Sequence, residues 1–445
     1  SDASNKFGSH SNKKILPVWS VSAMVNIKES ILKDVDFMDE FRLRSSVGIQ
    51  GNMLDDQSPN LIIKQGVIDP LYNENISTVA RYPNPNLLWE RTHQYNIELN
   101  TSFLNNRLSI NATYYSKNTS DVFTHVKVSS INGVPGDTYV MNGGDISNKG
   151  YSIGLQGYPI RNKYFNWSAS TYISGNFNKV ISGTVESYRL EDYLNGYAIV
   201  DGQPISTFYS YKFMGLNPYN GTPIFDDYSD QQHLLKYKPL NETLFMVLEN
   251  SGQREPILSG NLFNTFTYKR LALSTNFSYN IGGKVRLFAL YNPIISGVSA
   301  DMNIRKEFVN RWKAPGDEKY TNIPVIMSPS DLDYTYYYSH FSTATSAATG
   351  IQLYARSVWD MYDKSNLRVV SASYFKCSSL TFRYTIDPQL LAGTPISNAQ
   401  ISLSGMNLFT ISSKSLRGQD PSQAGFAQPN LPVRPSYTLQ FNLTF

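Results

Sequence analysis

The chain has 445 residues and a formal net charge of +4, and 41% of its residues are hydrophobic. The small charge excludes the basic footprint of a nucleic-acid-binding protein. The single cysteine, Cys377, excludes an intrachain disulfide, and the lack of any run of eighteen apolar residues excludes a transmembrane helix. Tyrosine is abundant, with 31 Tyr beside 23 Phe, which suits the headgroup level of a membrane because the ring is apolar and the hydroxyl polar.

Alternation of apolar and polar residues predicts about eleven strands. They cover residues 15–28, 40–52, 88–103, 107–123, 148–160, 163–180, 258–269, 270–283, 370–387, 398–412 and 433–445. Each is long enough for a tilted bilayer crossing, which takes roughly 9–11 residues. Short turns alternate with long connections over 53–87, 124–147, 181–257, 284–369 and 413–432. This asymmetry is typical of outer-membrane barrels, with periplasmic turns and extracellular loops.

The last strand shows the alternation most clearly, with Tyr437, Leu439, Phe441, Leu443 and Phe445 on one face. The other face is polar and uncharged, so the apolar face meets either a second sheet or lipid. An aromatic last residue is a mark of bacterial outer-membrane barrels. The pattern predicts which residues face lipid and which face the lumen. Lipid-facing residues are Leu271, Leu273, Phe277, Leu439, Phe441 and Leu443, and lumen-facing residues are Ser274, Asn276, Gln440 and Asn442.

The odd number of strands has a structural consequence. Single-chain bacterial barrels have an even count with both ends in the periplasm, and an open sheet would leave unpaired edges in lipid. We therefore expect this chain to be half of a barrel whose edge strands pair with strands outside it. No export signal opens the chain, which indicates a mature protein or a piece of a longer one.

No catalytic motif is found among the five histidines, His10, His93, His125, His233 and His340. None has the spacing of a metalloprotease helix or lies beside a nucleophile elbow, so we expect no enzymatic activity and no cofactor. Two acidic runs can supply oxygen ligands for Ca²⁺, although solvated acidic loops are much commoner. The runs are Asp226, Asp227 and Asp230, and Asp331 with Asp333.

An aromatic cluster lies in the longest outer connection. It contains Tyr334, Tyr336, Tyr337 and Tyr338, followed by His340 and Phe341. These four tyrosines are the candidate substrate-binding residues, because flat rings with hydroxyls stack on sugars or peptide side chains. The alternative is a tyrosine-rich loop that packs against its neighbours or a partner chain.

Several segments, taken together and in order, resemble the C-terminal half of the SusC/RagA-like TonB-dependent transporters of Bacteroidetes. They are Asp2–Gly8, Leu16–Ser22, Phe41–Asn52, Asn84–Glu90, Asn148–Gly150, Tyr209–Pro218, Arg311–Asp317 and Ser404–Thr410. The segment Tyr374–Phe382 departs from the family's usual sequence, but keeps its alternation. The signal sequence, the plug, the TonB box and roughly the first half of the barrel have no counterpart here.

The resemblance implies an all-β fold in which residues 1–445 form the C-terminal half of a barrel of roughly 22 strands. It implies a multi-pass protein of the bacterial outer membrane that imports a large nutrient, such as an oligosaccharide or a peptide. The implied partners are the remaining N-terminal barrel and plug half, a SusD-like surface lipoprotein, and the TonB–ExbB–ExbD system through the missing part. Outer-membrane lipid and lipopolysaccharide complete the surroundings. A structural scaffold subunit and a passive porin or adhesin are the alternatives.

Overall fold

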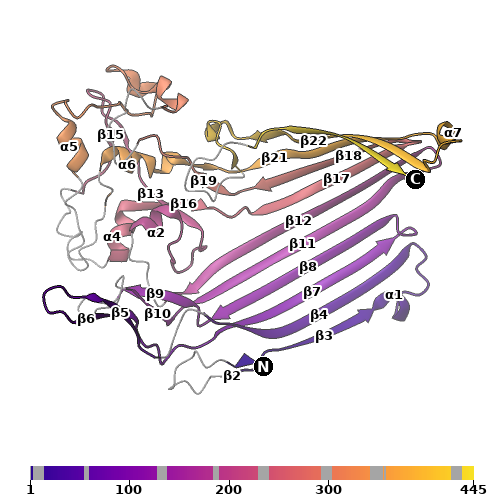
Figure 1. Cartoon of the computed structure of the whole chain (residues 1–445), viewed down its shortest axis with the longest axis horizontal. Coiled ribbons are helices and arrows are strands. Elements are labelled where there is room, and N and C mark those ends of the chain that lie inside the picture. Colours follow the sequence, from indigo (N-terminus) through magenta and orange to yellow (C-terminus); the bar gives the residue numbers. More distant parts are fainter. Residues whose placement is uncertain are drawn as a thin grey trace. The chain divides into compact units, whose positions relative to one another are not determined.

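One antiparallel sheet of eleven strands dominates the computed structural model (Figure 1). The structure describes residues 2–3, 15–54, 60–127, 138–183, 190–228, 240–291, 303–340, 354, 357–421 and 433–445. Strands that are neighbours along the chain are neighbours in the sheet, with β3 and β23 at its edges. The strands are β3 (Trp19–Asn26), β4 (Met38–Asn52), β7 (Glu90–Phe103), β8 (Leu108–Ser120), β11 (Asp145–Arg161), β12 (Phe165–Ser182), β17 (Leu258–Tyr268), β18 (Leu271–Ile281), β21 (Tyr374–Thr385), β22 (Asn398–Ser412) and β23 (Ser436–Thr444).

All eleven predicted strands are confirmed, with ends that differ by a few residues. The short turn after β7 contains Leu104, Asn105 and Asn106, which all have a positive φ of 58–59°. Asparagine tolerates this left-handed conformation, as the sequence indicated. A leucine there is unusual and was not expected.

The chain divides into two compact units. Unit 1 contains residues Ser1–Gly157, Tyr172–Glu186 and Ile199–Ile205, and unit 2 contains Tyr158–Thr171, Ser187–Ala198 and Ser206–Phe445. In unit 1, Val25 pairs with Leu43, Leu43 with Leu99, and Leu99 with Ala112, which pairs with Ile153. Since side chains opposite one another share a face, this row is an apolar face across five strands.

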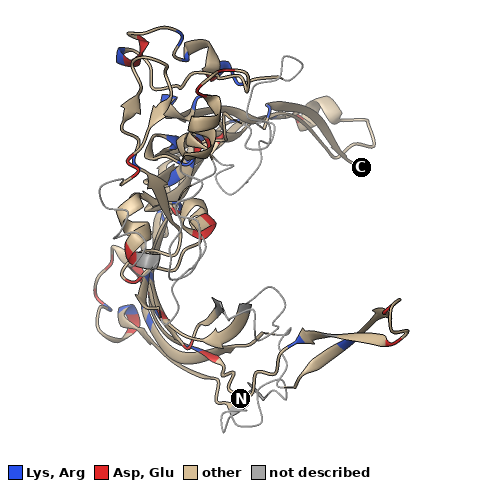
Figure 2. Ribbon diagram, turned by 90° about the vertical axis from the view of Figure 1, so that its left-hand side faces the viewer, with Lys and Arg blue, Asp and Glu red and all other residues tan. Residues whose placement is uncertain are grey.

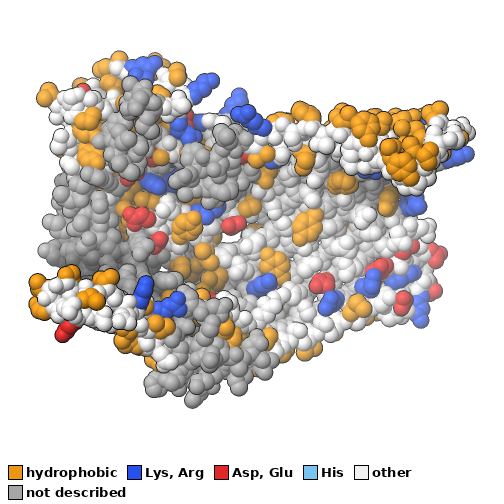
Figure 3. All heavy atoms as spheres, in the orientation of Figure 1, with side chains coloured by type: hydrophobic (Ala, Val, Ile, Leu, Met, Phe, Trp, Pro, Cys, Tyr) orange, Lys and Arg blue, Asp and Glu red, His pale blue; other side chains and the backbone are white. Residues whose placement is uncertain are grey.

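In unit 2 the register builds the corresponding face. Leu273 pairs with Phe266 and Phe382, and Leu403 pairs with Phe382 and Leu439. The opposite face carries hydroxyls, as where Thr381 Oγ1 lies 3.0 Å from Ser404 Oγ. In the space-filling view, the sheet face turned to the viewer carries few hydrophobic side chains (Figure 3). The expected separation of apolar and polar residues onto two faces is thus present in the register.

Charged residues are rare in the strands of unit 2. β17, β18, β22 and β23 contain none, and β21 contains only Lys376 and Arg383. Lys, Arg, Asp and Glu gather mainly in the connections (Figure 2). Strands without charges fit a hydrocarbon environment, in which a buried charge is costly.

The long connections have structure of their own, which the sequence did not predict. In unit 1 they contain the pairs β5 (Ile62–Ile68) with β6 (Asn75–Arg81), and β9 (Phe123–Lys127) with β10 (Thr138–Asn142). A further pair, β1 (Asp2–Ala3) with β2 (Ile15–Leu16), precedes β3. In unit 2 they contain the pairs β13 (Thr207–Tyr211) with β16 (Leu248–Gln253), β14 (Gly215–Leu216) with β15 (Pro223–Ile224), and β19 (Lys284–Arg286) with β20 (Val369–Ser371).

The helices are short. Those in the long connections are α2 (Leu190–Asn195), α4 (Leu240–Val247), η4 (Lys306–Asn310), η5 (Asp317–Lys319), α5 (Tyr334–Ser339), α6 (Val358–Asp363), η6 (Asn366–Arg368) and η7 (Lys414–Leu416), while α1 (Ile27–Ser30) and α7 (Pro388–Leu391) lie in short turns. Within the described ranges, no helix has the length and apolar character needed to span a bilayer.

Candidate functional site

The candidate tyrosines lie on one short helix of unit 2, α5. Tyr334 is buried, and its ring stacks on Tyr338 one turn later, with centroids 5.5 Å apart. The ring of Tyr334 also stacks on Trp359 of α6, with centroids 5.7 Å apart. Residues four apart share one side of a helix, so Tyr334 and Tyr338 form the packed side of α5.

The remaining two tyrosines differ in their contacts. The Tyr336 side chain is 56% exposed and lies 4.7 Å from the His340 ring. The hydroxyl of Tyr337 accepts hydrogen bonds from Asn220 Nδ2 at 3.0 Å and Asn217 Nδ2 at 3.5 Å. The structure therefore brings all four residues into one element, but gives each a different environment.

The turn 217–222, whose asparagines bind the Tyr337 hydroxyl, is itself fixed by contacts with a second segment. Gly221 has φ +69°, and a Cβ on it would overlap the Trp312 indole, so only glycine fits. The Gly221 carbonyl also accepts a hydrogen bond from the Val325 amide at 3.0 Å. The segments 217–222 and 312–325 therefore form one firm support beside α5.

The proposed calcium ligands are engaged in other contacts. Asp227 Oδ2 lies 2.9 Å from His340 Nε2, and Asp226 Oδ1 accepts a hydrogen bond from the Tyr228 amide. Asp331 Oδ2 accepts one from the Ser328 amide at 2.6 Å. Asp230, His10, His233 and Phe341 lie outside the described residues. Among the residues that the structure describes, no three His, Cys, Asp or Glu side chains form a metal-binding group.

A buried charge network joins the long connections of unit 2, which together are called the loop assembly. Arg368 is 1% exposed and donates from Nη1 to Glu307 Oε2 at 2.8 Å and from Nη2 to the Phe288 carbonyl at 2.5 Å. Arg417 Nη1 contacts the same Glu307 oxygen at 2.5 Å. Burial opposes ionisation of Glu307, but the two arginines outweigh it and lower the pKa of this carboxyl.

Asp363 and Arg286 occupy the centre of this assembly. The Asp363 carboxylate accepts hydrogen bonds from the Leu290 and Tyr291 amides, both at 2.8 Å, and burial raises its pKa to about 6. Arg286 donates to the Leu194, Ser365 and Tyr209 carbonyls, and burial lowers its pKa to about 10. The Arg286 side chain thus joins two long connections, 181–257 through Leu194 and Tyr209, and 284–369 through Ser365.

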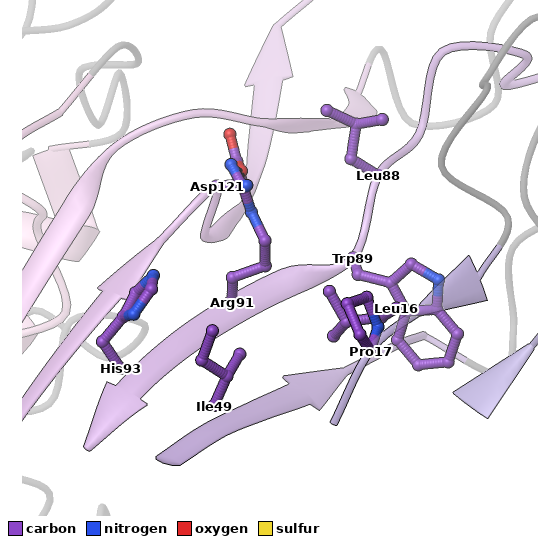
Figure 4. Close-up of a pocket in the computed structure, with 8 residues that line it drawn as sticks. All are labelled: Leu16, Pro17, Ile49, Leu88, Trp89, Arg91, His93 and Asp121. Atoms are coloured by element: carbon purple, nitrogen blue, oxygen red, sulfur yellow. Dashed lines mark hydrogen bonds and ion pairs between the residues drawn. The ribbon is translucent and has the colours of Figure 1, made fainter. Parts of the chain in front are cut away.

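A pocket of about 200 Å³ lies in unit 1, at the end of the sheet where the long connections begin (Figure 4). Arg91 points to Asp121 and donates to its Oδ2 from Nη2 at 2.5 Å and from Nε at 3.1 Å. The indole of Trp89 lies beside Leu16 and Pro17 and forms the apolar wall. The complete lining is Leu16, Pro17, Ile49, Leu88, Trp89, Arg91, His93 and Asp121.

Sequence reasoning missed this pocket. Its residues come from β4, from β2 and β7 with the residues beside their ends, and from Asp121 just after β8. Neither alternation nor motif spacing indicates that they meet. The one available signal is Gly51 near the end of β4, where a Cβ would overlap the Leu16 side chain and crowd Trp89. A glycine inside a strand marks a place where other groups approach closely.

Comparison with known proteins finds a family model that matches part of the chain, and several similar proteins. Residues 36–231 match the family model described as TonB dependent receptor-like, beta-barrel. The chain is 23% identical over 96% of its length to TonB-dependent receptor P3 of Formosa agariphila, and covers 40% of that protein. It is 27% identical over 40% of its length to TonB-dependent receptor SusC of Bacteroides thetaiotaomicron, and covers 18% of that protein.

A solved structure described as the RagAB peptide transporter has the same fold. It matches 99% of this chain with a TM-score of 0.74 and 20% identity, while this chain covers 44% of it. A structure of the RagAB peptide importer in the "open-open" state matches with a TM-score of 0.72. The chain thus spans less than half the length of the relatives and structures that it matches.

Proposed function

Since the chain carries a β-barrel segment of a SusC/RagA-like TonB-dependent receptor of the outer membrane, we propose that it works in energy-coupled import of a large nutrient. The cargo is an oligosaccharide or a peptide too large for porins. Residues 1–445 supply the C-terminal half of the barrel in this proposal. The plug and the contact with the TonB–ExbB–ExbD system belong to the other half of the receptor.

One observation carries the proposal: the strands of unit 2 that contain few or no charges continue into a folded loop assembly. β17, β18, β22 and β23 lack charges, yet their long connections bury Arg368 and Asp363. Ordering such long connections has a conformational entropy cost. A channel does not need connections of this length to reverse the direction of the chain between two strands. A firm binding surface above the barrel is a reason to maintain them.

Several large apolar side chains of this assembly are exposed. Tyr219, Tyr320 and Leu332 are 86%, 90% and 101% exposed, and Tyr336 is 56% exposed. Large apolar side chains held on a firm support favour a protein or cargo contact. We assign these four residues to contact with a SusD-like surface lipoprotein or with the cargo that it delivers. Of the original tyrosine cluster, Tyr336 is the residue best placed for this role.

The alternative is a scaffold subunit, in which the same exposed residues hold a permanent protein partner. A complementation experiment distinguishes the two functions, in a strain that lacks the gene for the full-length receptor. That strain is complemented with the intact gene or with a version without its TonB box. Import predicts that growth on the limiting polymeric nutrient returns only with the intact gene. Equal restoration by both versions would contradict energy-coupled import and favour the scaffold.

A further inference from the structure

The pocket of unit 1 that is lined by Trp89, Arg91 and His93, called the rim pocket from here on, opens on the apolar face of the sheet. Ile49 pairs with His93 across β4 and β7, and two residues further along, Val47 pairs with Tyr95. Residues two apart in a strand point the same way, so His93 belongs to the face that carries Tyr95, Ile97 and Leu99. By the same alternation, Arg91 belongs to it as well. In an outer-membrane protein this is the face that meets lipid.

The pocket also lies at the height of the lipid headgroups. The apolar band of such barrels is about 25 Å tall and is crossed by roughly 10 tilted residues. β7 has 14 residues and β11 has 17, so their ends extend beyond the band. Arg91 and His93 are the second and fourth residues of β7, at the end from which the long, extracellular connections depart.

The polar groups of this rim suit an anion. A guanidinium has five N–H groups, and Asp121 accepts from two of its nitrogens, so Arg91 keeps further donors. His93 offers a ring nitrogen beside it. Lys149 of β11 is exposed. It pairs with Ser116 of β8, which pairs with Tyr95 of β7, two residues along the strand from His93. Strands are about 4.8 Å apart, so a lysine side chain two strands away reaches the same headgroup.

Apolar surface continues from the pocket along the sheet. Trp89 and Leu16 are buried and form one wall. Below them, Val47 and Tyr95 are 47% and 42% exposed on the apolar face. An amphiphile can thus place an anionic group at Arg91 and Lys149 and an acyl chain over Tyr95 and Val47, which a soluble anion cannot do.

We propose that the rim pocket and Lys149 bind a phosphate of the lipid A part of lipopolysaccharide, the phosphorylated glycolipid of the outer leaflet. Arg91, His93 and Lys149 bind the phosphate, and the acyl chains lie along Val47 and Tyr95. This inference depends on the outer-membrane placement of the chain. It does not depend on transport, so loss of lipid binding with normal nutrient uptake, or the reverse, separates the two proposals.

The test uses the full-length receptor in detergent, titrated with bis-phosphorylated lipid A and followed by native mass spectrometry. The probe is compared with the same lipid after phosphatase treatment and with phosphatidylglycerol. The variants are Lys149→Glu and Arg91→Gln, and the matched control is Lys163→Glu, an exposed lysine in the turn at the opposite end of the strands. Heat-modifiable electrophoretic mobility checks that each barrel is folded.

We expect each of the two rim variants to weaken lipid A binding about tenfold, since each removes a cation from a phosphate near the membrane surface. Phosphatase treatment should weaken binding to the wild type to a similar degree, and Lys163→Glu should bind as the wild type does. If a rim variant misfolds, the other one decides. Unchanged affinity in a folded rim variant would overturn the proposal, as would equal affinity of the wild type for phosphatidylglycerol.

Discussion

The ring of Tyr334 lies on the indole of Trp359, with centroids 5.7 Å apart and planes inclined by 22°. This contact joins α5 to α6, whose last residue is the buried Asp363. The tyrosine cluster is therefore connected to the central charge network, while Tyr336 remains open to solvent. Tyr334 therefore packs inside the assembly, whereas Tyr336 of the same short helix is exposed and is the residue that we propose for recognition.

The first prediction separates these two roles. Replacing Tyr336 and Tyr219 with Ala should lower nutrient uptake or lipoprotein binding several-fold, because loss of an aromatic contact costs about 1 kcal/mol for each ring. Replacing Tyr334 with Ala should instead loosen the loop assembly, because it leaves a cavity against Trp359. Co-purification of the lipoprotein and limited proteolysis of the loops measure the two effects. Normal binding by the Tyr336 and Tyr219 double variant would leave these rings without a recognition role.

The second prediction concerns the firm turn beside α5. Gly221→Ala places a Cβ against the Trp312 indole at a φ of +69°, so it should destabilise the loops by more than the roughly 1 kcal/mol of backbone strain alone. Gly316→Ala is the matched control, because Gly316 has φ +104° with nothing within 4 Å of its Cβ. Proteolytic susceptibility compares them. Equal effects of both substitutions would show that the Trp312 contact does not constrain the turn.

The third prediction concerns pH. Burial raises the pKa of Asp363 to about 6, above the value of roughly 4 expected in an unfolded chain. Between these values the folded state holds a proton that the unfolded state has lost. The stability of the loop assembly should therefore fall as pH rises from about 4 to 6, and change little from this group above that range. Glu307 has a lowered pKa and acts in the opposite direction, but only below its ordinary pKa.

Hydrogen exchange of the Leu290 and Tyr291 amides measures this pH effect, after correction for intrinsic exchange rates. These amides donate to Asp363. Their protection should therefore fall together with the stability of the loop assembly as pH rises from about 4 to 6. Asp363→Asn should weaken protection at every pH, because its amide has one acceptor oxygen for two N–H groups, and should abolish the slope between pH 4 and 6. A slope that survives the substitution would assign it to another group.

The strands were predictable because their pattern has one solution. A slip of one residue would turn Leu273, Leu403 and Leu439 to the polar face, and the register confirms their alignment. Alternation also revealed the turns at Asn105 and at Lys269, which has φ 52°. Local pattern therefore specifies the sheet almost completely.

The loop assembly was not predictable in the same way. The sequence left open whether the tyrosines form a binding surface or pack against their neighbours, because whether Tyr334 is buried depends on Trp359, which is 25 residues away. The charge network joins Arg286, Glu307, Arg368 and Arg417 across more than a hundred residues, and the rim pocket joins Leu16 to Asp121. These sites arise from tertiary contacts that no local periodicity encodes.

The central claim is that the apolar face of the sheet lies in lipid, and cysteine labelling with a lipid-confined reagent tests it most directly. In a full-length receptor with Cys377→Ser, single cysteines are placed at Leu273, Leu439, Asn276 and Gln440. The account predicts modification at 273 and 439, with 276 and 440 protected, because successive side chains of a strand alternate between its faces. Modification at 276 and 440 with protection at 273 and 439 would contradict it.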